Sequence, residues 1–100
     1  MTFYPLEKIH RLYDGYQQAF TVAGKDLLLI QDSGEVFLLR NACPHLSAPL
    51  TYASINNGVI RCPMHGIDFQ LRSGCALLSP IGPLEKFEPV YEGNQLGILC

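Results

Sequence analysis

The sequence is poor in charge and contains no long apolar run. Charged residues make up 16% of its 100 positions, the formal net charge at pH 7 is −2, and there is no tryptophan. The seven Lys and Arg residues are scattered and form no basic cluster of the kind that binds a phosphate backbone. The densest apolar stretch, Leu27–Ile30, is far shorter than the ~20 residues that a membrane-spanning helix needs. Nucleic-acid binding and insertion into a membrane are therefore not expected.

The rest of the composition predicts one small globular domain, residues 1–100. Hydrophobic residues make up 48% of the chain, which argues against intrinsic disorder and is enough for one core. The first residues contain no basic segment followed by an apolar one, so no secretory signal is visible and a cytosolic location is expected. In that compartment four cysteines point to metal or redox chemistry more than to two disulfides, although disulfides stay an alternative.

The periodicity of apolar residues is that of strands, and no segment shows a capped helical pattern. Glycine, proline and asparagine separate the expected strands, which favours an all-β fold, an antiparallel sandwich or barrel. Alternation and turn residues predict strands over 16–22, 26–31, 36–40, 59–61, 67–71, 84–90 and 95–99. The last two of these are expected to pair with each other.

Two short loops combine cysteine, proline and histidine in the same order. The first is Cys43-Pro44-His45, and the second is Cys62-Pro63-Met64-His65. Structural zinc sites usually pair their ligands at other spacings, so a single tetrahedral ion fits this pattern poorly. The spacing fits better if the two thiolates hold one iron and the two imidazoles hold another. A zinc site and a disulfide remain the alternatives at this point.

The extended motifs Cys-Pro-His-x-x-Ala-Pro-Leu and Cys-Pro-x-His-Gly-x-x-Phe resemble the two cluster-binding loops of Rieske iron–sulfur proteins. The resemblance to short soluble Rieske-type ferredoxins covers residues 36–90. It implies one [2Fe-2S] cluster, held by Cys43, His45, Cys62 and His65, within a cluster-binding subdomain of about residues 41–83. It also implies that a proline loop, residues 80–84, covers the cluster.

The function that follows from this resemblance is electron transport. Such ferredoxins carry one electron from an NAD(P)H-dependent flavoprotein reductase to a terminal oxygenase, such as a dioxygenase. The chain is accordingly expected to be a monomeric carrier without catalytic residues. The alternatives are the small subunit of an NAD(P)H nitrite reductase and a zinc-binding interaction module without redox activity.

The resemblance also predicts a low reduction potential. Ala48 and Met64 stand where high-potential relatives have a disulfide between the loops, and Ile67 and Phe69 stand where those relatives place hydroxyl groups near the cluster. Fewer hydrogen bonds to the cluster sulfurs stabilise the reduced state less.

Three further residues are expected to have no role in the site. Cys75 is expected in or near the core, because cysteine is among the most buried residue types. Cys100 is expected to be exposed and incidental, and His10 is expected on the surface.

Overall fold

The computed structural model describes residues 1–44, 47–64, 66–78 and 80–100, and this part of the chain is built almost entirely of antiparallel strands. No helix in these ranges is long and apolar enough to cross a membrane. The all-β expectation is therefore confirmed. In chain order the elements are β1 (Phe3–Lys8), the 3-10 turn η1 (Ile9–Arg11), β2 (Gln17–Val22), β3 (Lys25–Asp32), β4 (Glu35–Arg40), β5 (Ser54–Asn56), β6 (Val59–Arg61), β7 (Asp68–Gln70), β8 (Lys86–Phe87), β9 (Val90–Glu92) and β10 (Gln95–Leu99).

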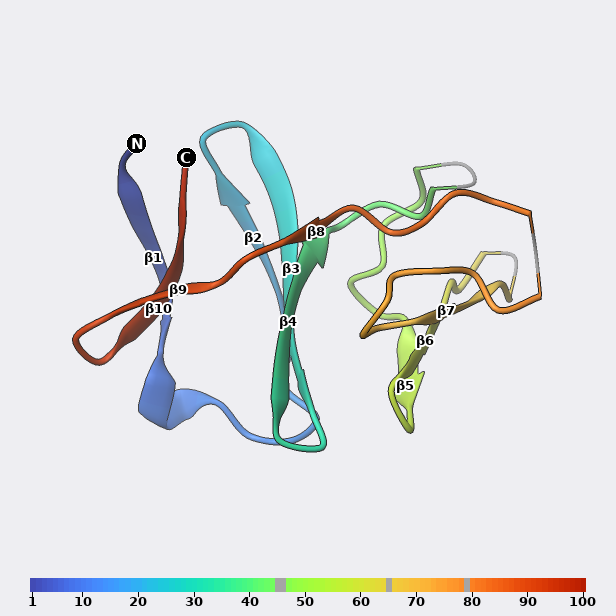
Figure 1. The fold of residues 1–100 in the computed structure, drawn as a ribbon, viewed down its shortest axis with the longest axis horizontal. Coiled ribbons are helices and arrows are strands. Elements are labelled where there is room, and N and C mark those ends of the chain that lie inside the picture. The colour runs from blue at the N-terminus through green and yellow to red at the C-terminus, as the bar shows by residue number, and fades with distance from the viewer. Residues whose placement is uncertain (45–46, 65, 79) are drawn as a thin grey trace.

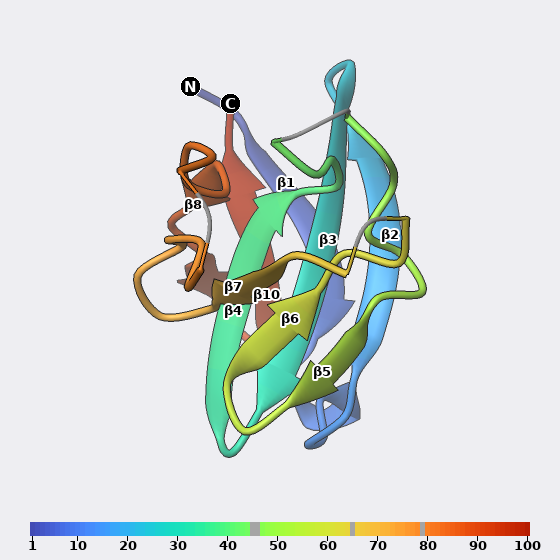
Figure 2. The same ribbon diagram turned by 90° about the vertical axis from the view of Figure 1, so that its right-hand side faces the viewer.

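The strands form three sheets stacked along the longest dimension of the molecule, which measures 39 × 28 × 20 Å (Figure 1). The outer sheet that holds both chain ends has the order β1-β10-β9. The middle sheet has the order β2-β3-β4-β8, and the small outer sheet has the order β5-β6-β7. Figure 2 looks onto the small sheet, with the middle sheet behind it.

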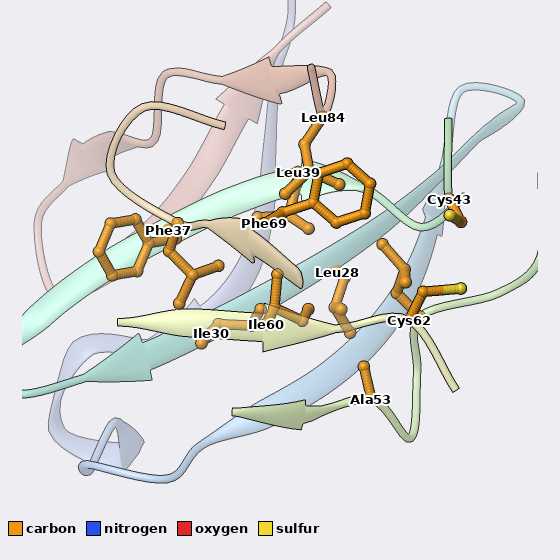
Figure 3. Close-up of a cluster of buried hydrophobic side chains, with 12 residues drawn as sticks. Leu28, Ile30, Phe37, Leu39, Cys43, Ala53, Ile60, Cys62, Phe69 and Leu84 are labelled. Carbon is orange, nitrogen blue, oxygen red and sulfur yellow. The ribbon is translucent and has the colours of Figure 1, made fainter. Parts of the chain in front are cut away.

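The middle sheet is apolar on both faces, and this explains the dense apolar run Leu27–Ile30 in the sequence. Successive side chains of a strand point to opposite faces. Leu27 and Leu29 accordingly belong to the core shared with the sheet that holds the chain ends, whereas Leu28 and Ile30 belong to the core beneath the small sheet. All four side chains are fully buried. The middle sheet thus supports the small sheet and its loops through one continuous core (Figure 3).

Tight turns fix the register of the hairpins. Ser33 and Gly34 join β3 to β4, and Asn57 and Gly58 join β5 to β6, all with positive φ between 51° and 78°. Two consecutive left-handed residues make the two-residue turn that matches the twist of antiparallel strands. The turn residues in the sequence therefore indicate these hairpins correctly.

The structure corrects the expected pairing of the C-terminal strands. The segment expected as one strand, 84–90, is divided between β8 and β9. β8 pairs with β4, and β9 pairs with β10. Glu88 and Pro89 separate the two strands, and proline has no N–H to continue a ladder.

Two strands were not expected from the sequence. β1 pairs with β10 at the edge of its sheet, with a register shift between Pro5 and Glu7, so it lacks clean alternation. β5 has only three residues, of which Ser54 and Asn56 are exposed. Both strands depend on pairing with a partner more than on their own pattern.

Candidate metal centre

The two cysteine-containing loops lie at the same end of the molecule. The first follows β4 of the middle sheet, and the second connects β6 to β7 of the small sheet. Both lie at the end of the molecule opposite the chain termini (Figures 1 and 2). The segment 76–84 runs along this same end (Figures 1 and 2). The fold thus brings together the three segments that the sequence singled out.

The two loops close in the same way. The N–H of Cys43 donates to the carbonyl of Ala48 at 2.7 Å, and the N–H of Ser47 donates back to the carbonyl of Cys43 at 2.7 Å. In the second loop, the N–H of Cys62 donates to Ile67 and the N–H of Gly66 donates to Cys62, both at 2.9 Å. Each cysteine is therefore the first residue of a loop whose next four residues are enclosed by two backbone hydrogen bonds.

The backbone angles and the prolines explain this shared geometry. The fourth enclosed residue is left-handed in both loops, with φ of 57° at Ser47 and 65° at Gly66. The first enclosed residue is Pro44 or Pro63, whose fixed φ suits the start of a turn and whose missing N–H is not needed there. The echo between the two Cys-Pro motifs is thus a repeat of one backbone structure.

Both cysteine side chains are buried in the same hydrophobic core. Cys43 is 1% exposed and Cys62 is fully buried, and both belong to the cluster that contains Phe69 and Leu50. Figure 3 shows the two at the same end of this cluster. Cys62 forms no disulfide. Two buried thiols at the same end of one core are donors that suit iron in an iron–sulfur cluster, so these residues fit the group that the sequence predicts.

Two polar side chains fasten the far end of the first loop to the middle sheet. The side-chain amide of Gln17, on β2, donates to the carbonyls of Leu50, Thr51 and Ala53 at 3.3, 2.8 and 3.0 Å. The side chain of Asn41 accepts from the N–H of Leu50 and donates to the hydroxyl of Thr51, both at 2.7 Å. Sequence analysis did not single out Gln17 or Asn41, because their partners are distant in the sequence or are backbone atoms.

The second loop is fastened by an ion pair at its base. Arg61, the last residue of β6, lies opposite Asp68, the first residue of β7, and its guanidinium bonds both carboxylate oxygens at 2.7 and 3.0 Å. Hydrogen bonding from Arg61 lowers the pKa of Asp68 below its usual value. The pair therefore stays ionised at neutral pH and joins the two strands from which Cys62 and Ile67 extend.

The segment 76–84 is anchored at both ends. Ala76 forms a β-bridge with Phe69, and the N–H of Leu77 donates to Asp68 at 3.0 Å. At the other end, the N–H of Leu84 donates to Gly74 at 2.8 Å, and Leu84 is buried in the core that contains both cysteines. The proline-rich part, 80–83, is thus held between two fixed points at the loop end.

The expected ligands divide into two groups. The structure brings Cys43 and Cys62 together, whereas His45 and His65 lie outside the described residues. Within the described ranges, no group of three or more His, Cys, Asp and Glu side chains gathers around a common point. The set of four ligands accordingly stays a prediction.

The burial expected for Cys75 is wrong, the exposure expected for Cys100 is found only in part, and the surface position expected for His10 is confirmed. Cys75 is exposed. It ends a third loop of the same type, in which the backbone N–H of Gln70 donates to the carbonyl of Cys75 at 2.9 Å. In this loop the buried side chain is that of Leu71 and not that of the cysteine. Cys100 is half-buried and packs against the core between the outer and middle sheets. His10 is exposed, as expected.

Comparison with known proteins gives the family. The model of the Rieske [2Fe-2S] domain matches residues 2–88. The ferredoxin component of the naphthalene 1,2-dioxygenase system of Pseudomonas aeruginosa is 31% identical over 91 residues, which cover 90% of this chain and 88% of that protein. Human apoptosis-inducing factor 3 is 35% identical over 86 residues, which cover 85% of this chain. The chain spans only 14% of the length of that human protein and of its mouse counterpart.

Solved structures agree with this result. The ferredoxin of Sphingomonas yanoikuyae B1 superposes with a TM-score of 0.84 at 27% identity, over 97% of each chain. The putative small subunit of a nitrite reductase superposes with a TM-score of 0.78 at 18% identity, which shows a shared fold alone. The family match over residues 2–88 and the two buried thiols in loops of one geometry lead to the same conclusion: the chain belongs to the Rieske [2Fe-2S] domain family, and its cofactor is one Rieske-type 2Fe-2S cluster.

Proposed function

We propose that this protein is an electron carrier that moves one electron at a time from an NAD(P)H-dependent reductase to a terminal oxygenase. The observation that carries the proposal is the match to ferredoxin components of naphthalene 1,2-dioxygenase systems over most of both lengths. A carrier needs a bound redox group near the surface and no substrate site of its own. The placement of both cysteine loops at one end of the fold supports this role (Figure 1).

The proposed ligands are Cys43 and Cys62 for one iron and His45 and His65 for the other. When bound, the cluster supplies a one-electron redox couple, with two neutral imidazoles in place of two thiolates. The protein contributes the two loops that hold the thiols at fixed positions in a hydrophobic core. The proposal includes a single Rieske domain over residues 1–100, with a cluster-binding part of about 41–83, that acts as a cytosolic monomer.

The ligand assignment is tested with single substitutions in the purified protein. His45→Ala and His65→Ala are expected to abolish the normal Rieske electron paramagnetic resonance signal of the reduced protein. Cys75→Ser is the matched control, because Cys75 is exposed. This variant is expected to bind the cluster as the wild type does. A normal signal in His65→Ala together with loss of the cluster in Cys75→Ser would contradict the assignment.

The function is tested by replacement. The holoprotein takes the place of the ferredoxin component in the reconstituted naphthalene 1,2-dioxygenase system of Pseudomonas putida, whose ferredoxin is 33% identical to this chain over 83 residues. Product formation that depends on this protein supports the carrier role. Stimulation of an NAD(P)H nitrite reductase large subunit, with no activity in oxygenase systems, would favour the alternative.

A further inference from the structure

The first cysteine loop is closed at its base by the side chain of Asn41. This residue follows β4 directly and stands two positions before Cys43. Its Oδ1 atom accepts from the N–H of Leu50, and its Nδ2 atom donates to the Oγ1 atom of Thr51, both at 2.7 Å. One amide thus joins the segment that enters the loop to the segment that leaves it.

The entering side of this base is fixed to the middle sheet. The backbone N–H of Asn41 donates to the carbonyl of Asp26 on β3 at 2.8 Å, which continues the β3–β4 ladder by one residue beyond the end of β4. The sheet therefore determines the backbone position of Asn41, and only its side-chain torsions must be ordered to hold Leu50.

The leaving side depends on side chains instead. Residues 47–50 belong to no strand, and Pro49 has no N–H. Leu50 is fully buried, and a buried N–H without a partner costs as much as a lost hydrogen bond. The partner of this N–H is Asn41, and the carbonyl of Leu50 lies 3.3 Å from the amide of Gln17. Two side-chain amides thus take the place of a backbone ladder.

Leu50 connects this base to the thiol of Cys43. Both side chains belong to the same buried cluster, together with Cys62. The N–H of Cys43 also donates to the carbonyl of Ala48, two residues before Leu50, at 2.7 Å. Because a close-packed core transmits displacements, a shift of Leu50 reaches Cys43 both through side-chain packing and through the backbone.

We infer that Asn41 is a positioning residue for the 2Fe-2S cluster: its side chain holds Leu50 and Thr51 in place, so that the thiol of Cys43 keeps one position toward the iron. The inference rests on the ligand role proposed for Cys43. Asn41 acts through the base of the loop and not on the cluster itself. A base that opens should let the thiol take several positions and should let a chelator reach the iron.

Three variants grade the two hydrogen bonds of Asn41. Asn41→Leu keeps the approximate size of the side chain and removes both bonds. Thr51→Val removes only the bond to the hydroxyl. Asn41→Asp is the conservative variant, because a carboxylate accepts both from the N–H of Leu50 and from the hydroxyl of Thr51, which can rotate to donate.

Two variants elsewhere in the protein are the controls. Asn56→Leu makes the same change of side chain at an exposed position on β5. Gly97→Ala lies on β10, in the sheet that holds the chain ends (Figure 1). Its added methyl group would overlap the carbonyl of Tyr4, so this variant should lower the global stability without touching the cysteine loops.

The first measurement is the line width of the electron paramagnetic resonance signal of each reduced holoprotein in frozen solution, where only molecules that hold a cluster contribute. Asn41→Leu should broaden the lines, because the thiol takes several positions, and Thr51→Val should broaden them less. Asn41→Asp, Asn56→Leu and Gly97→Ala should match the wild type. Wild-type line widths in both Asn41→Leu and Thr51→Val, or equal broadening in Gly97→Ala, would overturn the inference.

The second measurement is the rate at which the ferrous chelator ferrozine removes iron from the reduced holoproteins. Asn41→Leu should release iron about tenfold faster than the wild type, and Thr51→Val a few-fold faster. Asn41→Asp and Asn56→Leu should stay within about twofold of the wild type. A release rate in Gly97→Ala as high as that in Asn41→Leu would show that global unfolding controls release and would count against the inference. If Asn41→Leu binds no cluster, Thr51→Val decides the question.

A further variant separates this inference from the proposals on which it rests. A normal cluster signal in Cys43→Ala would overturn the ligand role of Cys43 and this inference with it. Loss of that signal, together with wild-type line widths in Asn41→Leu and Thr51→Val, would overturn the inference alone. Both measurements use no partner protein, so a failure to support an oxygenase would overturn only the carrier role.

Discussion

The attachment of the first loop to β2 through Gln17 leads to a quantitative prediction. The amide of Gln17 lies within hydrogen-bond distance of three carbonyls, those of Leu50, Thr51 and Ala53, but it has only two hydrogens. It therefore contributes about two hydrogen bonds, each worth roughly 1 kcal/mol in net stability. Gln17→Leu preserves the size of the side chain and removes both. We expect a loss of about 2 kcal/mol in the free energy of unfolding and a melting temperature lower by about 10 °C.

The neighbouring residue Gln18 provides the control. Its side chain is exposed and reaches only the carbonyl of Ala19, at 3.5 Å, so Gln18→Leu should change stability by less than about 0.5 kcal/mol. Urea unfolding of the holoproteins, followed by circular dichroism and by the visible absorption of the cluster, measures both variants. Hydrogen exchange should also accelerate around residues 47–53 in Gln17→Leu alone. Equal stability of the two variants, or unchanged exchange in that segment, would refute the view that Gln17 holds the first loop in place.

Three further predictions concern the potential, the pH dependence and the packing of the protein. The apolar Ile67 and the buried Phe69 offer no side-chain hydrogen bond to cluster sulfurs, so redox titration should give a potential near or below about −50 mV, and a value above about +100 mV would contradict this. Hydrogen bonds from the backbone of Lys8 and then from the Tyr16 hydroxyl lower the pKa of Glu7. Its stabilising effect is therefore present above the ordinary pKa of 4.5 and is lost as pH falls through the lowered value. Acid unfolding of Glu7→Gln should accordingly show a shallower pH dependence than that of the wild type. A side chain at Gly97 would overlap the carbonyl of Tyr4, so Gly97→Ala should lower the free energy of unfolding by about 1–3 kcal/mol in urea titrations, whereas Gly82→Ala, with open space around it, should not.

The local sequence pattern was sufficient to predict those elements whose structure is determined by residues close together in the chain. β6 and β10 have the bounds that alternation and turn residues predicted, and the turns at Ser33-Gly34 and Asn57-Gly58 form as expected. The two Cys-Pro motifs likewise predicted loops, because proline and a left-handed fourth residue determine a turn locally. The cofactor followed from these motifs by family resemblance, and the comparisons confirm it.

What depends on distant contacts was not visible in the sequence. β8 pairs with β4 rather than with its neighbour in the chain, and β1 pairs with the last strand. The hydrogen bonds from Gln17 join residues 33–36 positions apart, and nothing about a glutamine on a strand indicates such partners. Cys75 was misjudged for a related reason: its residue type favours burial, but the loop that ends at Cys75 fills the core with Leu71 and leaves the thiol outside.

The placement of Cys43 and Cys62 within the hydrophobic core connects stability to redox function in this fold. Each cysteine is the residue at which a strand or its extension leaves the core, and its backbone closes the loop that follows. The positions of the two thiols are consequently set by the packing of Leu50, Phe69 and their neighbours beneath the small sheet, which is close-packed and resists small displacements. Pro44, Pro63 and Met64, by contrast, are exposed and lie outside this core. The core therefore determines the positions of the two thiols that are proposed to bind the cluster, so a substitution that loosens this core should disturb cluster binding as well as stability.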